Sequence, residues 1–193
     1  MRKTLLFALA AAGLMASAPV GASDSIKGLA DTCNNCHGVD GVSAGGSMPS
    51  LAGLPETYLR DTMLEWKAGT RFSATMGRLI KGYSEDEIVA LAKYFAEKPW
   101  TPVAQANLDP KMINEGKWAT DRCVECHGER GGEPDNDKTP RIDGQVARYI
   151  ELELLKYRDP AINLPHEKMR RNTSRLTEEE VVGLAHFYAS QQK

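Results

Sequence analysis

The hydrophobic and polar positions of this chain repeat with a helical period in two similar halves. Apolar residues recur every three or four positions in two segments: Ile88, Leu91, Ala92 and Phe95, then Val181, Leu184, Ala185 and Tyr188. This spacing places the apolar side chains on one face of a helix. Each segment follows a hydroxyl residue with a glutamate three positions later, Ser84 with Glu87 and Thr177 with Glu180. That pair is typical of a capping box, so the sequence predicts two equivalent amphipathic helices with defined starts.

The remaining segments follow the same order in both halves, which indicates an internal repeat. Further helical stretches are predicted at residues 26–33, 56–68, 112–123 and 145–158. Met76 and Met169 each lie in a loop, eight residues before the cap of the final helix. Prolines punctuate the segment between the halves, as in a connector. We therefore predict an all-α protein with two domains, residues 23–98 and 111–193, joined by a linker at residues 99–110.

The first 22 residues have the features of a secretory signal peptide. Arg2 and Lys3 are followed by an apolar run over residues 5–15 and then by small residues that end at Ala22. The apolar run is too short to span a bilayer, so we expect cleavage after Ala22, export to the periplasm and no membrane span. Cleavage removes two positive charges and no negative ones, which changes the formal charge from −2 to −4. This mild acidity, without a basic stripe, argues against a nucleic-acid partner.

Two copies of one cysteine motif carry the candidate chemistry. They are D-T-C-N-N-C-H-G at residues 31–38 and D-R-C-V-E-C-H-G at residues 121–128. Four cysteines in an exported protein are compatible with disulfides, but a redox-active C-x-x-C is typical of a βαβ unit, which this helical pattern lacks. Zinc is a second alternative, but a structural zinc site takes four ligands, and no further C-x-x-C or spaced histidine pair is present.

The histidine directly after the second cysteine favours a third alternative, the covalent attachment of haem. Two thiols bind the vinyl groups of a c-type haem, and the adjacent imidazole binds the iron from the same turn. We therefore predict two haem c groups. The attaching and iron-binding residues are Cys33, Cys36 and His37 in the first half and Cys123, Cys126 and His127 in the second. The side chains expected to pack around this cofactor are Tyr58, Leu64, Trp66, Phe72, Tyr149, Leu155 and Tyr157.

Methionines are the first candidates for the sixth iron ligand. In the first half, Met63 lies mid-helix whereas Met76 lies in a loop, so Met76 is favoured. In the second half, two residues compete. His166 lies 39 residues after His127, the same distance that separates Met76 from His37. Met169 lies eight residues before the helix cap, the same distance that separates Met76 from its own cap. We favour Met169, because loops absorb insertions and this loop runs directly into the capped helix. Two irons with histidine and methionine ligands have no open position for a substrate, which predicts an electron carrier and not an enzyme.

These motifs resemble those of the tandem dihaem class I cytochromes c over the whole mature chain. The resemblance implies that the carbonyl groups of Pro49 and Pro140 accept hydrogen bonds from the two proximal histidines, which leaves Met48 poorly placed as a ligand. The segment A-T-M-G-R-L-I-K-G-Y-S at residues 74–84 and the ending F-Y-A-S-Q-Q are similar to one branch of this group. That branch is the cytochrome subunit of flavocytochrome c sulfide dehydrogenase.

The branch implies a periplasmic complex in which an FAD-containing flavoprotein oxidises sulfide and passes the electrons to the dihaem chain. We therefore expect a haem subunit with a flavoprotein partner and with a downstream cytochrome or oxidase as electron acceptor. The alternative is a free-standing dihaem carrier between a membrane oxidoreductase and a terminal oxidase. A third hypothesis, a catalytic dihaem enzyme, requires one iron with a displaceable ligand.

Overall fold

The computed structural model describes residues 22–192, and this part of the chain contains helices and no strand. The α-helices are α1 (Ala22–His37), α2 (Glu56–Ala68), α3 (Met76–Leu79), α4 (Glu85–Ala96), α5 (Pro110–Lys117), α6 (Val124–His127), α7 (Ala147–Arg158), α8 (Glu167–Thr173) and α9 (Glu178–Ser190). Short 3-10 turns lie at Val39–Gly41, Ile80–Gly82 and Thr120–Arg122. The predicted all-α class is confirmed. The predicted signal peptide lies outside the described residues, apart from its last position.

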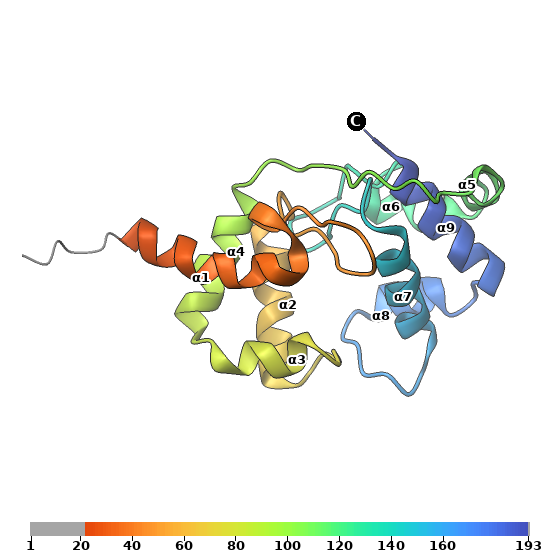
Figure 1. The fold of residues 1–193 in the computed structure, drawn as a ribbon. Coiled ribbons are helices and arrows are strands. Elements are labelled where there is room, and N and C mark those ends of the chain that lie inside the picture. The colour runs from red at the N-terminus through yellow and green to blue at the C-terminus, as the bar shows by residue number, and fades with distance from the viewer. Residues whose placement is uncertain (1–21, 193) are drawn as a thin grey trace, which may run out of the picture.

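Figure 1 shows two groups of helices side by side, α1 to α4 in the N-terminal half and α5 to α9 in the C-terminal half. An extended segment crosses one side of the molecule from α4 to α5. Each half has its own buried apolar cluster. The clusters are Ala30, Leu54, Leu59, Leu91, Ala92 and Phe95, and Ile150, Leu154, Leu176, Val181, Leu184, Ala185, Phe187 and Tyr188. Each half therefore packs around its own last helix, α4 or α9.

Both predicted capping boxes are present. Ser84 Oγ accepts a hydrogen bond from Glu87 N at 3.2 Å, and the Glu87 carboxylate accepts one from Ser84 N at 2.7 Å. The same two bonds join Thr177 and Glu180 at 3.1 Å and 2.8 Å. These bonds satisfy amide groups that the first turn of a helix leaves without a partner. The helices α4 and α9 therefore begin where the sequence predicts.

Several predicted elements differ from the structure. The helix predicted at residues 26–33 is longer, since α1 covers Ala22–His37, and the one predicted at 145–158 begins at Ala147. The helix predicted at residues 112–123 is broken, because α5 ends at Lys117 and a 3-10 turn leads into α6. Met76 and Met169 lie in short helices and not in loops. Met76 N donates to Ser73 Oγ at 3.1 Å, and Thr173 Oγ1 donates to the Met169 carbonyl at 3.0 Å. Helices as short as α3 and α8 give no clear apolar period, so the sequence does not distinguish them from loops.

Hydrogen bonds join the two halves directly. Tyr58 N donates to the carbonyl oxygen of Asp137 at 3.0 Å, and Phe72 N donates to that of Asn163 at 2.9 Å. Thr57 Oγ1 donates to Asp137 Oδ2 at 2.7 Å. These directional contacts help to fix the relative position of the halves.

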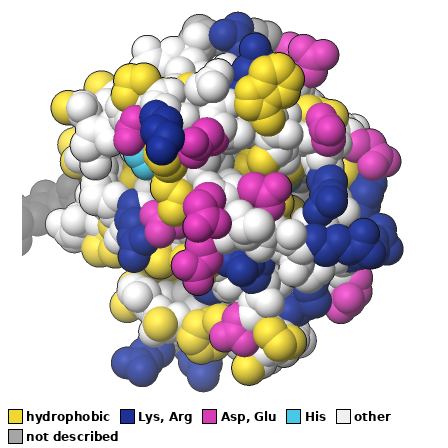
Figure 2. Space-filling view, turned by 90° about the vertical axis from the view of Figure 1, so that its right-hand side faces the viewer, with side chains coloured by type: hydrophobic (Ala, Val, Ile, Leu, Met, Phe, Trp, Pro, Cys, Tyr) yellow, Lys and Arg dark blue, Asp and Glu magenta, His cyan; other side chains and the backbone are white. Residues whose placement is uncertain are grey.

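Positive and negative side chains are interspersed over the face that Figure 2 shows, on the side of the C-terminal half. This face has no extended area of one sign, which agrees with the small formal charge of −2. Within residues 22–192, no helix combines the length and the apolar character needed to cross a membrane.

The helices α5 and α9 touch at two glycines. A Cβ atom built on Gly116 would lie 2.0 Å from the carbonyl oxygen of Gly183, and one built on Gly183 would lie 2.9 Å from Gly116 N. Both neighbours are backbone atoms, so neither can turn away as a side chain can. The C-terminal half therefore depends on a close approach of two main chains.

We predict that Gly116→Ala lowers the free energy of unfolding by about 1–3 kcal/mol or more, because the added methyl group forces the two helices apart. Gly28→Ala is the matched control in α1, where a Cβ atom would meet nothing within 4 Å. That variant should raise the free energy of unfolding by about 0.4–1 kcal/mol. Thermal unfolding followed by circular dichroism measures both. Equal melting temperatures for the two variants would contradict the assigned role of Gly116.

Candidate haem sites

The two motif histidines end their helices in the same way. His37 is the last residue of α1 and His127 is the last residue of α6. His37 Nδ1 lies 2.8 Å from the carbonyl oxygen of Pro49, and His127 Nδ1 lies 2.9 Å from that of Pro140. Because a carbonyl oxygen only accepts, each Nδ1 carries the proton and each Nε2 is left with its lone pair. This is the tautomer that a metal-binding imidazole requires.

Burial favours the neutral form of both imidazoles. It lowers the pKa of His37, and the hydrogen bond to Pro49 opposes that shift. Burial likewise lowers the pKa of His127, against the hydrogen bond to Pro140 and the charge of Asp135. His37 is 7% exposed and His127 is 9% exposed. Neutral histidine is the form that binds a metal ion.

A glycine turn brings the proline segment back over each imidazole. Gly38 has φ 79°, and a Cβ atom there would lie 1.9 Å from the carbonyl oxygen of Val42. The Gly41 carbonyl then accepts hydrogen bonds from Leu51 N at 2.8 Å and Ala52 N at 3.1 Å. The second half has the same pattern: the carbonyl at position 131 accepts from the amides at positions 142 and 143. Backbone contacts therefore position the proline carbonyl in both halves.

A cavity of about 500 Å³, lined mainly by the C-terminal half, brings the predicted site residues of that half together. Cys123, Cys126, His127, Pro140 and Met169 all line it. Its apolar walls include Ile150, Leu154, Leu176 and Leu184. Two thiols, a neutral imidazole and a thioether around an apolar space match the groups that hold a c-type haem. The residues present in this half therefore fit the cofactor.

Met169 and His166, the competing sixth ligands, both border this cavity but differ in their surroundings. Met169 packs against the buried cluster of the C-terminal half. The side chain of His166 is 43% exposed, and its Nε2 lies 3.8 Å from Glu65 Oε2 of the other half. Burial and the charge of Arg71 lower the pKa of His166, and Glu65 opposes them. Met169 is thus directed to the core, and His166 to the boundary between the halves.

The three methionines of the N-terminal half also differ. Met48 is 38% exposed and directly precedes Pro49. Met63 packs from α2 against the buried cluster of its half. Met76 is half-buried at the start of α3. These positions keep Met76 as the preferred candidate.

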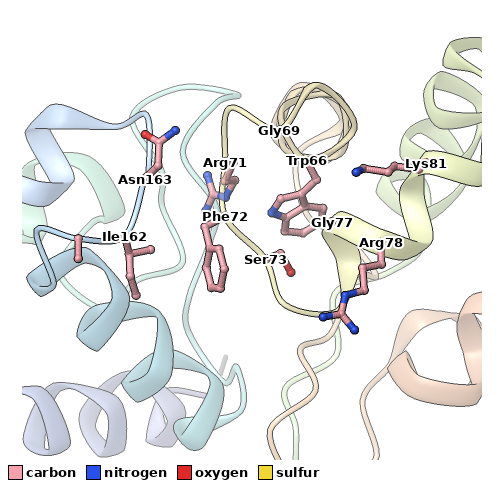
Figure 3. A pocket seen from close by; sticks show the side chains of 11 residues that line it. Trp66, Gly69, Arg71, Phe72, Ser73, Gly77, Arg78, Lys81, Ile162 and Asn163 are labelled. Atoms are coloured by element: carbon pink, nitrogen blue, oxygen red, sulfur yellow. The ribbon is translucent and has the colours of Figure 1, made fainter.

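A second pocket, of about 410 Å³, lies beside Met76 at the boundary between the halves (Figure 3). Gly77, Arg78 and Lys81 line it on one side, and residues 161–163 of the C-terminal half line the other. Trp66 also lines it, and Trp66 Nε1 is buried with no hydrogen-bond partner among the described residues. A buried N–H donor and cationic side chains suit a carboxylate, and haem carries two propionates. Cys33, Cys36, His37 and Met76 do not line this pocket, so the fit of the first half to the cofactor rests on the contact between His37 and Pro49.

The structure supplies neither alternative to haem in the part that it describes. None of the four cysteines forms a disulfide. Residues 22–192 contain no group of three or more histidine, cysteine, aspartate or glutamate side chains that could hold a metal ion. A zinc site therefore has no ligand set in this part of the chain. One packing prediction is wrong: Phe72 is 47% exposed. Its backbone is held by Asn163, which leaves the ring at the rim of the pocket in Figure 3.

The sequence analysis missed a buried ionic contact between the halves. The side chain of Arg71 is 5% exposed. Arg71 Nη1 lies 3.4 Å from Glu65 Oε2, and Arg71 Nη2 lies 4.0 Å from Glu153 Oε2 across the boundary. No local motif marks Arg71, because its partners come from two helices and its burial depends on how the halves meet. Sequence reasoning also missed Gln145, which is 2% exposed and forms hydrogen bonds with Ser50 of the other half.

No protein-family model matches the chain. Among curated proteins, the chain is similar to cytochrome c4 of Azotobacter vinelandii, at 29% identity over an alignment of 205 positions that covers 95% of each chain. Cytochrome c4 of Pseudomonas aeruginosa is 30% identical over 165 residues, which cover 81% of this chain and 80% of the relative. The thiosulfate dehydrogenase electron acceptor of Thiomonas intermedia is 30% identical over 173 residues, which cover 84% of this chain and 79% of the relative.

Among solved structures, reduced recombinant cytochrome c4 from Pseudomonas stutzeri matches with a TM-score of 0.77 and 23% identity. The match covers 90% of this chain and 100% of that chain, and it confirms the fold of two tandem class I cytochrome domains. A shorter likeness is to the cytochrome subunit of sulfide dehydrogenase from Chlorobaculum tepidum. It reaches 40% identity over 67 residues, which cover 35% of this chain and 60% of the relative.

We predict that Arg71→Met lowers the free energy of unfolding by about 3 kcal/mol, because it removes the buried cation that pairs with Glu65 and leaves Glu153 with Lys156 alone. Arg60→Met is the control, since Arg60 pairs with Asp61 where both side chains are about one-third exposed, at 35% and 36%. That change should stay within about 0.5 kcal/mol. Denaturant unfolding of the haem-loaded chain measures both. A loss for Arg60→Met as large as that for Arg71→Met would show that burial is not the cause.

Proposed function

This chain belongs to the cytochrome c4 family, and from that membership we propose that it is a freely diffusing dihaem carrier of the periplasm. It binds two covalent haem c groups and transfers electrons without catalysing a reaction of its own. The observation that carries the proposal is the cavity in which Cys123, Cys126, His127 and Met169 meet. With both His127 and Met169 as ligands, a bound iron would have no open position for a substrate.

The residues of each half have separate tasks in this proposal. Two cysteines of each motif attach the haem, and His37 and His127 bind the iron through Nε2. Pro49 and Pro140 orient these imidazoles through their carbonyl groups, and Met76 and Met169 are the sixth ligands. When bound, each haem supplies a one-electron iron couple, whose potential a thioether ligand raises relative to a second histidine. The apolar walls exclude water from this couple.

The comparisons favour the free carrier over the subunit of a sulfide dehydrogenase that the sequence motifs suggested. Two relatives matched over most of their length are named cytochrome c4, and a third is named as the electron acceptor of thiosulfate dehydrogenase. We therefore infer a separate dehydrogenase as electron donor and a downstream cytochrome or oxidase as acceptor. The haem subunit of an FAD-containing flavoprotein remains the second candidate, supported by the 40% identity over 67 residues.

The test is to purify the full chain from its own periplasm at native concentration. A free carrier elutes as a monomeric dihaem protein without flavin absorbance, and added thiosulfate dehydrogenase and thiosulfate reduce it. Stable co-elution with an FAD-containing chain would replace the first candidate by the second. Recovery of the chain in the cytoplasm, without covalent haem, would contradict both.

We predict that Met169→Ala removes roughly half of the Met–iron absorption of the oxidised protein, because Met76 continues to ligate the other haem. His166→Ala is the control at the same cavity and should retain the full absorption. Visible spectroscopy of both variants measures this. The reverse result, with loss in the His166 variant alone, would assign the ligand to His166.

A further inference from the structure

A glutamine of the C-terminal half is bound to the proline segment of the N-terminal half. Gln145 is 2% exposed and Ser50 is fully buried. Ser50 N donates to Gln145 Oε1 at 2.8 Å, and Gln145 Nε2 donates to the Ser50 carbonyl at 3.1 Å. Val146 N also donates to Gln145 Oε1, at 3.0 Å. Because two N–H groups point to Oε1, the orientation of the amide is determined.

The Ser50 amide belongs to the same peptide group as the carbonyl that binds His37. The peptide between Pro49 and Ser50 donates its N–H to Gln145 and accepts at its oxygen the Nδ1–H of His37. Hydrogen bonds in such a chain polarise one another, so a partner on the N–H makes the oxygen a stronger acceptor. A stronger acceptor on Nδ1 makes a metal-bound imidazole more electron-donating.

Only one of the two halves supplies a glutamine for this contact. Gln145 lies five residues after Pro140, and the residue five after Pro49 is Leu54. Leu54 has no polar group and packs in the apolar cluster of its own half. The first half therefore has no glutamine at the matching position to bind the second proline peptide.

We propose that Gln145 is a positioning residue through which the C-terminal half lowers the reduction potential of the haem in the N-terminal half. The proposal rests on the ligand role given to His37 above. A more electron-donating imidazole stabilises ferric iron over ferrous iron, which lowers the potential. The two halves then differ in potential while their ligand types stay the same.

Attachment of the halves is the simpler role for this contact, and other bonds already provide it. Tyr58 and Phe72 each donate a backbone hydrogen bond across the boundary, and Thr57 adds a side-chain bond to Asp137. None of these bonds involves the Pro49–Ser50 peptide. If Gln145 only attached the halves to each other, its removal and the removal of any of these other bonds would have similar effects on the reduction potentials.

The experiment compares Gln145→Leu with Thr57→Val in the full haem-loaded chain, by a redox titration that resolves the two haems. We expect Gln145→Leu to raise the equilibrium constant for reduction of the first haem by about three- to tenfold, or about 30–60 mV. The second haem, whose cavity Gln145 also borders, should shift by less. Thr57→Val should leave both potentials unchanged. The nuclear magnetic resonance signal of the His37 Nδ1 proton should move in the Gln145 variant alone.

Several results would overturn the proposal: an unchanged potential of the first haem, an equal shift in Thr57→Val, or a larger shift at the second haem. If Gln145→Leu does not fold, Gln145→Met tests the same point, because methionine has a similar length and no amide. The wild-type protein separates this proposal from the proposed function. If wild-type His37 does not ligate iron, both fail, whereas normal ligation without a Gln145 effect rejects this inference alone.

Discussion

The hydrogen bond from a buried imidazole to a proline carbonyl is the contact around which each half is arranged. It requires the helix that carries the motif to stop at the histidine, and a chain reversal at the following glycine. It also requires the segment after the reversal to be held, which the carbonyl groups of Gly41 and Gly131 do. The last helix of each half then covers this arrangement with its apolar face. An imidazole fixed in this way keeps the lone pair of Nε2 available to bind a metal ion.

The parts of the fold that depend on near neighbours were predictable from the sequence. The capping boxes at Ser84 and Thr177 involve residues three positions apart, and helix α2 has the predicted bounds Glu56–Ala68. The cysteine motif specifies the chemistry of its site within six residues. The repeat also indicated two domains, because the motif, the methionine and the capped helix follow one another in the same order in both halves, with each methionine eight residues before its cap.

The parts that depend on how the halves meet were not predictable in this way. Arg71 and Gln145 are polar residues whose burial results from contacts with the other half. Phe72 has the composition of a core residue, yet it is exposed, because its backbone is paired with Asn163. Comparison of the two halves offered one sequence signal for such a contact, because Gln145 occupies the position that is equivalent to Leu54 in the first half. A polar residue at an apolar position of a repeat indicates a contact that the repeat unit alone does not make.

The boundary between the halves therefore has a different character from their cores. The cores are apolar and similar, whereas the boundary contains Arg71, Glu153 and the Gln145 amide. Charged and polar groups in a place of low dielectric act strongly on neighbouring charges. A carrier made of two identical halves would hold an electron equally well on either side. Unequal polar contacts at the boundary give the chain a means to distinguish its two irons without altering the ligands of either one.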